Sequence, residues 1–327
     1  MGELDLRAVR AFTALMEHRQ FGLAAGALRI SQQAVSKRIA RLEALLGVSL
    51  FDRVPTGAEP TVAALRFLPH AQSLLAVADQ AVAAVAGLAR PLRVAVLGER
   101  QAEMRAMRFY LGRHPDADIE LVLSTSYLTS RDALLNGRVD AAFARAHGGP
   151  RPLPRRIAAV PAYLDALHLL VGRGHPLAGR STVALAELAG QQVWVPGAAI
   201  PSEWADFYRD LAKSSGVVID QSPRPGLFAG SDTTRGPAPI EGLVEAVARS
   251  DSLATFTGEG FETPWHPEIR RISVVDPTPA YPHALLWDTT DQHPELPALA
   301  EHFRTGYNRD VAAGCWIPDS DRALFIS

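Results

Sequence analysis

Apolar residues recur at helical spacing through the first fifty residues of the chain. The pattern predicts a helix from about Leu6 to His18, with Asp5 as its N-cap. A short helix follows over Leu23–Leu28, and Ser31 then caps a third helix that ends at Gly47. The buried stripe of this third helix is formed by Val35, Ile39, Leu42 and Leu46.

The pattern changes after the third helix. The run Leu50–Arg53, a turn at Pro55–Gly57 and a return toward Thr61 predict a short hairpin, the wing. Thr61 then caps a long helix that extends to about Leu88. We interpret this helix as an exposed dimerising linker rather than as a core helix. Its residues available for a seam are Leu68, Leu75, Val82 and Val85.

From Leu92 onward, strand patterns alternate with helical ones. The predicted strands cover Leu92–Val96, Ile119–Leu123, Ala141–Phe143, Leu167–Val171, Val193–Val195, Arg271–Val275 and Ala284–Trp287. The predicted helices cover about Gln101–Arg113, Arg131–Asn136 and a final one at Leu296–Tyr307. This alternation indicates an α/β fold with a parallel, doubly wound sheet. The segment Gly226–Pro239 is rich in glycine and proline and is predicted to be a loop.

Composition narrows the class of protein. An apolar fraction of 47% is typical of a globular chain. A single cysteine, Cys315, excludes an internal disulfide framework and a cysteine-rich zinc site. The first ten residues lack the apolar core of a secretory signal, and no apolar stretch has the length of a membrane span. We therefore expect a soluble, cytoplasmic protein without a membrane partner.

Positive charge gathers near the third helix. The net charge is −2, but residues 1–60 hold eight Lys and Arg against six Asp and Glu. Within Arg29–Arg53 the balance is five basic to two acidic residues. The outward face of the third helix carries polar and cationic side chains: Gln32, Gln33, Ser36, Lys37 and Arg41. Gln can contact adenine, and Lys or Arg can contact phosphate or guanine, so this face is a candidate DNA-reading surface.

The stretch from Phe12 to Arg53 resembles the DNA-binding domain of the LysR-type transcriptional regulators. Matching residues, in order, include Phe21, Ala24, Ala25, Leu28, Ser31, Gln32, Ala34, Val35, Ser36, Ile39, Leu42, Glu43, Leu46, Gly47, Leu50, Phe51 and Arg53. The resemblance implies a winged helix-turn-helix in which the third helix faces DNA and Arg53, in the wing, holds the DNA backbone. Departures are Gln33, where the family often has proline, and Gln20 and Gly22, where Ser and Thr are common.

The C-terminal part resembles the same family more loosely. His175–Ala178, followed by Leu185 and Leu188, looks like its second effector subdomain. The resemblance implies a winged helix-turn-helix over 1–60, a linker helix over 61–90 and an effector-binding domain over 91–327. That domain would be two α/β lobes, similar to a periplasmic binding protein and joined by two crossing strands. Lobe I would comprise about 91–161 and 268–315, and lobe II about 162–267. The family's glycine-rich strand entry is replaced here by Arg249–Ser252.

Ligands of open α/β sheets sit beyond the carboxyl ends of the strands. This rule selects candidate effector-binding residues: Gly98, Glu99, Arg100, Ser124, Thr125, Ser126, Pro196, Gly197 and Ala198. Helix N-termini at this edge favour anions, and Arg100 strengthens that preference while Glu99 opposes it. We expect operator DNA, an unidentified small molecule, a homodimer or homotetramer and, for an activator, RNA polymerase as partners.

Enzymatic function is not indicated. The chain lacks the G-x-x-x-x-G-K-[ST], H-E-x-x-H and G-x-S-x-G motifs, and its ten histidines show no ligand spacing, so we expect neither a cofactor nor a metal. Two alternatives stay open. One is a regulator of the same fold that needs no effector, and the other is a solute-binding protein.

Overall fold

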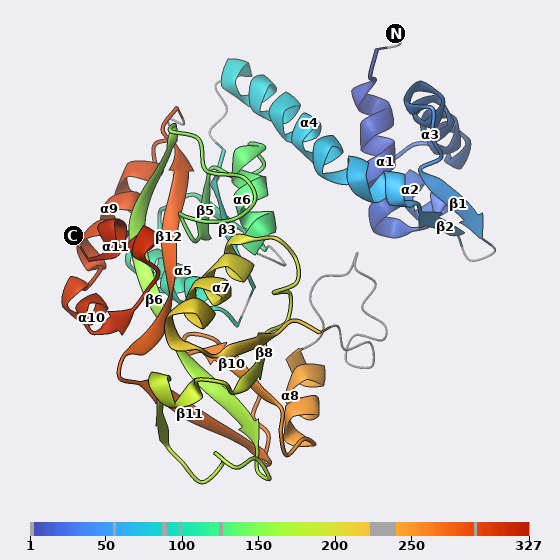
Figure 1. The fold of residues 1–327 in the computed structure, drawn as a ribbon. Coiled ribbons are helices and arrows are strands. Elements are labelled where there is room, and N and C mark those ends of the chain that lie inside the picture. Colours follow the sequence, from blue (N-terminus) through green and yellow to red (C-terminus); the bar gives the residue numbers. More distant parts are fainter. Residues whose placement is uncertain are drawn as a thin grey trace. The chain divides into compact units, whose positions relative to one another are not determined.

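A computed structural model of the chain describes residues 3–54, 57–86, 90–98, 100–123, 127–222, 240–290 and 293–326. The chain folds into two compact units, Met1–Arg90 with Asn136–Arg138 and Pro91–Leu135 with Val139–Ser327 (Figure 1). None of the described helices combines the length and the apolar character that a membrane span needs.

Unit 1 begins with three helices, α1 (Leu6–His18), α2 (Phe21–Ala27) and α3 (Gln32–Leu46). The predicted caps of α1 and α3 are confirmed. The Asp5 carboxylate accepts from the Arg7 amide, and the Ser31 hydroxyl accepts from the Ala34 amide. Gly47 ends α3 with a φ of 71°, which glycine adopts without strain. Helix α2 starts two residues before its predicted start. The three helices share a core that includes Val9, Phe12, Leu15, Ala24, Ala25, Val35, Ile39 and Leu42.

The predicted wing is an antiparallel pair, β1 (Phe51–Val54) and β2 (Gly57–Pro60). Gly57 permits its attachment to the rest of the unit, because a Cβ there would stand 2.3 Å from the Arg19 carbonyl oxygen. The long helix α4 (Val62–Ala86) follows, and the Thr61 hydroxyl caps it by accepting from the Ala64 amide.

Two of the predicted seam residues of α4 have contacts within unit 1. Leu68 and Leu75 are partly buried and pack against the helix-turn-helix core. The exposed large apolar residues in the C-terminal half of the helix are Leu74, Val77, Val82 and Val85, of which the last two belong to the predicted seam. Of the predicted seam, Val82 and Val85 are therefore exposed and left for a partner, whereas Leu68 and Leu75 are not.

Unit 2 has two lobes. Lobe I contains β3 (Leu92–Val96), β4 (Ile119–Leu123) and β5 (Ala141–Ala144), which are parallel in the order β4-β3-β5. Its helices are α5 (Ala102–Arg113), α6 (Tyr127–Leu135) and α9 (Leu296–Gly306). Lobe II contains β7 (Thr182–Ala184), β8 (Gln192–Trp194), β9 (Val218–Asp220), β10 (Ala254–Gly258) and β11 (Ile269–Val275). Its helices are α7 (Glu203–Ser215), α8 (Ile240–Ala248) and the 3-10 turn Leu185–Leu188.

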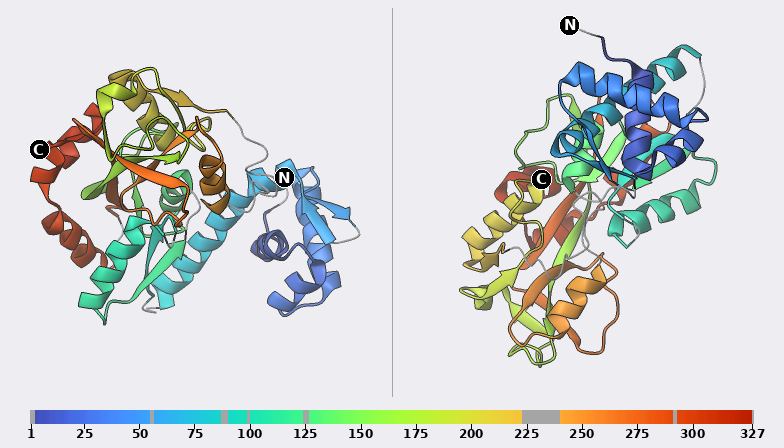
Figure 2. Two further views of the ribbon diagram at one scale, coloured as in Figure 1. Left: turned by 90° about the horizontal axis from the view of Figure 1, so that it is seen from below. Right: turned by 90° about the vertical axis from the view of Figure 1, so that its right-hand side faces the viewer.

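Two long strands, β6 (Ile157–Gly172) and β12 (Thr278–Asp288), connect the lobes and pair with each other in antiparallel orientation (Figures 1 and 2). The prediction of a parallel sheet was therefore wrong for this part, because β12 also runs antiparallel to β5. The predicted strands covered only one end of each. The apolar runs are interrupted by Pro161 and Asp165 in β6 and by Pro279 and Pro282 in β12. These interruptions resemble loop signals, so the predicted strands were too short.

The chain does not end at α9, which had been predicted as the final helix. Helix α10 (Arg309–Ala313), the short strand β13 (Cys315–Trp316) and helix α11 (Asp319–Phe325) follow. Strand β13 pairs with the start of β12, and Phe325 is fully buried in the lobe I core. This C-terminal segment is thus part of the effector-type domain.

Candidate functional site

The predicted DNA-reading side chains lie together on one face of α3. Gln33, Lys37 and Arg41 follow each other at four-residue steps and are exposed, and Gln32 is exposed beside them. Ser36 is half-buried on the same helix. The opposite face is fixed in the core, so this polar face is presented to solvent on a rigid element. The Arg53 side chain lies outside the described residues, although its backbone belongs to β1.

Glu43 positions the wing relative to α3. Its Oε1 accepts hydrogen bonds from the amides of Leu50 (2.7 Å) and Phe51 (3.2 Å) at the start of β1. On the other side, the Ala58 amide of β2 donates to the Arg19 carbonyl at 2.8 Å. From the sequence, Glu43 was only one of the residues that match the family. Its spacing of seven residues before Leu50 gave no sign of this tertiary role.

The predicted effector edge is only partly described. Gly98 and Arg100 follow β3, and the Arg100 carbonyl accepts from the Glu262 amide of lobe II at 2.9 Å. Pro196, Gly197 and Ala198 form the turn after β8, where the Pro196 carbonyl accepts from the Trp204 indole. Glu99, Ser124, Thr125 and Ser126 lie outside the described residues. The structure therefore brings the β3 edge against lobe II.

Two buried carboxylates lie beside this edge, and neither was predicted from the sequence. Glu103, in the first turn of α5, is fully buried and accepts from the Leu97 amide (3.2 Å) and the Tyr163 hydroxyl (2.6 Å). Asp165, on the connecting strand β6, is 8% exposed and accepts from the Gly260 amide at 2.7 Å. An isolated acidic residue within the apolar run of β6 was the available signal.

Burial perturbs the titration of this region. It raises the pKa of Asp165 to about 6 and also raises the pKa of Glu103, on which the charge of Asp165 acts in the same direction. Burial likewise raises the pKa of Tyr208 well above its ordinary value, and Asp165 adds to that effect. Perturbed groups gathered in one place are characteristic of functional sites.

A second polar group joins the lobes at the carboxyl end of β5. The Arg145 guanidinium is buried and donates to Asp321 of α11 (2.8 Å) and to the Glu203 carbonyl of α7 (3.1 Å). It also lies 3.3 Å from a carboxylate oxygen of Asp210, farther along α7. Arg145 is satisfied by these partners, so we interpret this group as a structural connection between lobe I, α7 and α11.

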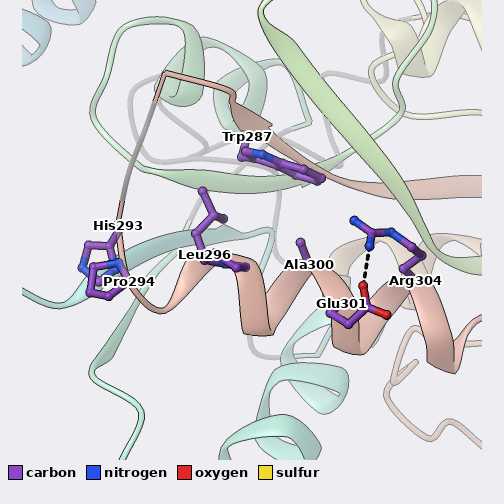
Figure 3. A pocket seen from close by; sticks show the side chains of 8 residues that line it. Trp287, His293, Pro294, Leu296, Ala300, Glu301 and Arg304 are labelled. Atoms are coloured by element: carbon purple, nitrogen blue, oxygen red, sulfur yellow. Dashed lines mark hydrogen bonds and ion pairs between the residues drawn. The ribbon is translucent and has the colours of Figure 1, made fainter.

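A separate pocket of about 690 Å³ lies between the end of β12 and α9 (Figure 3). Trp287 covers Leu296 and Ala300, and Arg304 pairs with Glu301 at its rim. Trp287 is in register with Ala141, the first residue of β5. The pocket is therefore at the amino edge of the parallel strands, opposite the edge where ligands of such sheets bind.

Known protein families match both units. Residues 6–65 match the family described as bacterial regulatory helix-turn-helix protein, lysR family. Residues 86–228 match the LysR substrate binding domain.

Individual relatives and solved structures agree with this result. The HTH-type transcriptional regulator BudR of Raoultella terrigena is 30% identical over 237 residues, which span 70% of this chain and 80% of that protein. A probable hydrogen peroxide-inducible genes activator of Mycobacterium avium is 34% identical over 198 residues, 56% of this chain and 60% of that protein. Full-length CbnR, solved with its target DNA, superposes with a TM-score of 0.60 at 23% identity and covers 92% of this chain and 99% of its own, which shows a shared fold.

Proposed function

Because the chain belongs to the LysR family of bacterial transcriptional regulators, whose DNA-binding and substrate-binding domains it carries, we propose that it binds an interrupted-palindrome operator as a dimer or tetramer and responds to a small molecule. We assign DNA binding to 1–60, linkage to 61–90 and effector binding to 91–327. For the lobes we propose bounds that differ from those expected from the sequence. Lobe II covers about 162–275, because β11 pairs with β6 and β7, and lobe I covers about 91–161 and 276–326, because Phe325 packs in its core. RNA polymerase is a further partner if the protein activates transcription.

The observation that carries this proposal is the polar face of α3. Helix α3 is buried on one side among α1 and α2 and exposes Gln32, Gln33, Lys37 and Arg41 on the other. We assign base reading to the glutamines and Ser36, and phosphate contacts to Lys37, Arg41 and Arg53. A rigid helix with this division of side chains suits the major groove.

The effector site is proposed at the edge formed by residues 98–100, 124–126 and 196–198, extended by the buried groups near Glu103 and Asp165. A thiol-pair switch does not suit this chain, because it has one cysteine and burial raises the pKa of Cys315. We therefore propose that the signal is a bound small molecule and not the formation of a disulfide within one chain.

We infer that the protein catalyses no reaction, since its relatives are regulators. We also infer a cytoplasmic location, because an operator is reached there.

The test is a comparison of cognate and random DNA. Wild-type protein should bind DNA flanking its own gene at least a thousandfold (~10³) more tightly than random DNA at physiological salt. Gln33→Ala should weaken cognate binding by about 1–3 kcal/mol while sparing random DNA. Lys37→Ala should weaken both and reduce the slope of log affinity against log salt by about one.

Arg304→Ala is the matched control, because it removes an exposed cation of unit 2. It should leave both affinities unchanged. Equal losses on cognate and random DNA for Gln33→Ala would remove the base-reading role. A wild-type protein without sequence preference would remove the proposed function.

A further inference from the structure

We propose that the small molecule of the effector site is an organic cation, an amine or guanidine, whose charge is held by the carboxylates of Glu103 and Asp165. This inference rests on the proposed function, because it names the chemical class of ligand for that site.

The two carboxylates come from different elements and meet where the lobes touch. Glu103 belongs to α5 of lobe I, and Asp165 belongs to β6, beside the segment that follows β10 of lobe II. Gly260 donates its amide to Asp165, and a Cβ on Gly260 would stand 2.4 Å from the Ala102 Cβ. A Cβ on Gly258 would stand 1.7 Å from Asp165 Oδ2. These glycines let the lobe II backbone lie directly against Asp165 and against Ala102, the neighbour of Glu103.

Neither carboxylate has a cation at ion-pair distance among the described residues. Glu103 accepts from an amide and a tyrosine hydroxyl, and Asp165 accepts from an amide. Arg105 and Arg271 are exposed and act on Asp165 only through space, and Glu259 opposes them. His283 supplies no charge near Tyr163, its stacking partner, because burial lowers the pKa of this histidine to about 3.

Buried carboxylates without a cation are costly, and a bound cation offsets that cost. Glu103 also changes the expectation for the N-terminus of α5. That end of a helix favours an anion, but the carboxylate of Glu103 already lies in the first turn and accepts from the Leu97 amide. An anionic ligand would meet this negative charge. The preference inferred from the helix end alone is thereby reversed.

A third group supports a ligand at this position. Tyr208 of α7 is 1% exposed, and its buried hydroxyl has no hydrogen-bond partner among the described residues. The charge of Asp165 acts on this hydroxyl. An unpartnered buried hydroxyl is unfavourable. An ammonium or guanidinium group offers several N–H donors, enough for both carboxylates and the Tyr208 oxygen.

The experiment is a thermal-shift titration of the full-length protein at pH 7.5 with matched compounds. The cations are 1,4-diaminobutane, agmatine, arginine and 2-phenylethylamine, and the corresponding anions are succinate, glutarate and 3-phenylpropanoate. We expect at least one cation, and none of the anions, to raise the melting temperature. Asp165→Asn and Glu103→Gln should each weaken the binding of that cation at least tenfold. Glu301→Gln, which changes an exposed carboxylate outside the site, should leave this binding unchanged.

Three results would overturn the inference: stabilisation by the anions, no stabilisation by any cation, or a cation effect unchanged in both variants. If one variant fails to fold, the other carries the comparison. The proposed function is tested separately. An anion that stabilises the protein and alters its DNA binding would contradict only the assignment of a cationic ligand and would agree with the proposed function. Absence of sequence-specific DNA binding would contradict the proposed function itself.

Discussion

At the scale of single residues, the polar surface positions were predictable and the buried polar ones were not, and Leu46, predicted to lie in the buried stripe of α3, is exposed. Gln33, Lys37 and Arg41 could be assigned to one face because helical spacing alone decides which side chains share a surface. Asp165 and Glu103 could not be paired from the sequence, because 62 positions separate them and only the arrangement of α5 and β6 brings them together. Glu43 is a similar case, since its role depends on where β1 begins.

The buried state of Asp165 predicts a specific pH dependence of stability. Its pKa is raised from 3.8 to about 6 in the folded protein, so between these values the folded state holds a proton that the unfolded chain releases. The free energy of unfolding therefore falls as the pH rises through this range, because the folded protein must then bury a charged carboxylate. The rise in pKa corresponds to at most about 3 kcal/mol.

Asp165→Asn removes the charge but keeps an oxygen for the Gly260 amide. The variant should be more stable than wild type toward urea at pH 8, and the difference should shrink toward zero at pH 4. If the variant and wild type differ in stability by the same amount at both pH values, Asp165 does not carry a buried negative charge in the ligand-free protein.

At the scale of elements, prediction succeeded where a local signal marked both ends. Asp5, Ser31 and Gly47 fixed α1 and α3, and the five-residue strands β3 and β4 were predicted at their observed bounds. The long strands β6 and β12 were only partly predicted, since proline and charged residues within them resemble loop signals. Their pairing is a tertiary property.

The C-terminal half of α4 carries an apolar stripe at the spacing of one helix face. Positions 74, 77, 78, 81, 82 and 85 are all Leu, Val or Ala. Val82 is 66% exposed and Val85 is 91% exposed. Such a stripe on a soluble helix favours burial against a partner helix, so we place the dimer contact here and not at Leu68 and Leu75.

Val77→Glu with Val82→Glu should therefore dissociate the assembly, because the change would bury charge in the helix pair. Light scattering should report a lower mass, and affinity for a two-half-site operator should fall far more than affinity for a single half-site. Leu65→Glu is the control, because Leu65 is also exposed on α4 but points away from the stripe. Should the double variant retain its mass, the dimer forms elsewhere.

At the scale of the whole molecule, one chain combines two chemistries. We propose that the α3 face provides sequence-specific contacts and that the junction of the lobes provides a site for a ligand. A ligand changes DNA binding only if it favours one arrangement of the assembly over another. The lobe junction suits this role because β6 and β12 pass through both lobes and Arg145 connects α7 to α11.

The central claim is sequence-specific binding by a pair of α3 helices, and hydroxyl-radical footprinting of the full-length protein on DNA flanking its gene tests it most directly. We expect protection of two half-sites whose centres are about 10 base pairs apart, or a multiple of that, because the two helices enter the major groove on one side of the DNA. Protection should disappear with Val77→Glu and Val82→Glu combined. A footprint limited to one half-site, or uniform protection without sequence preference, would contradict this claim.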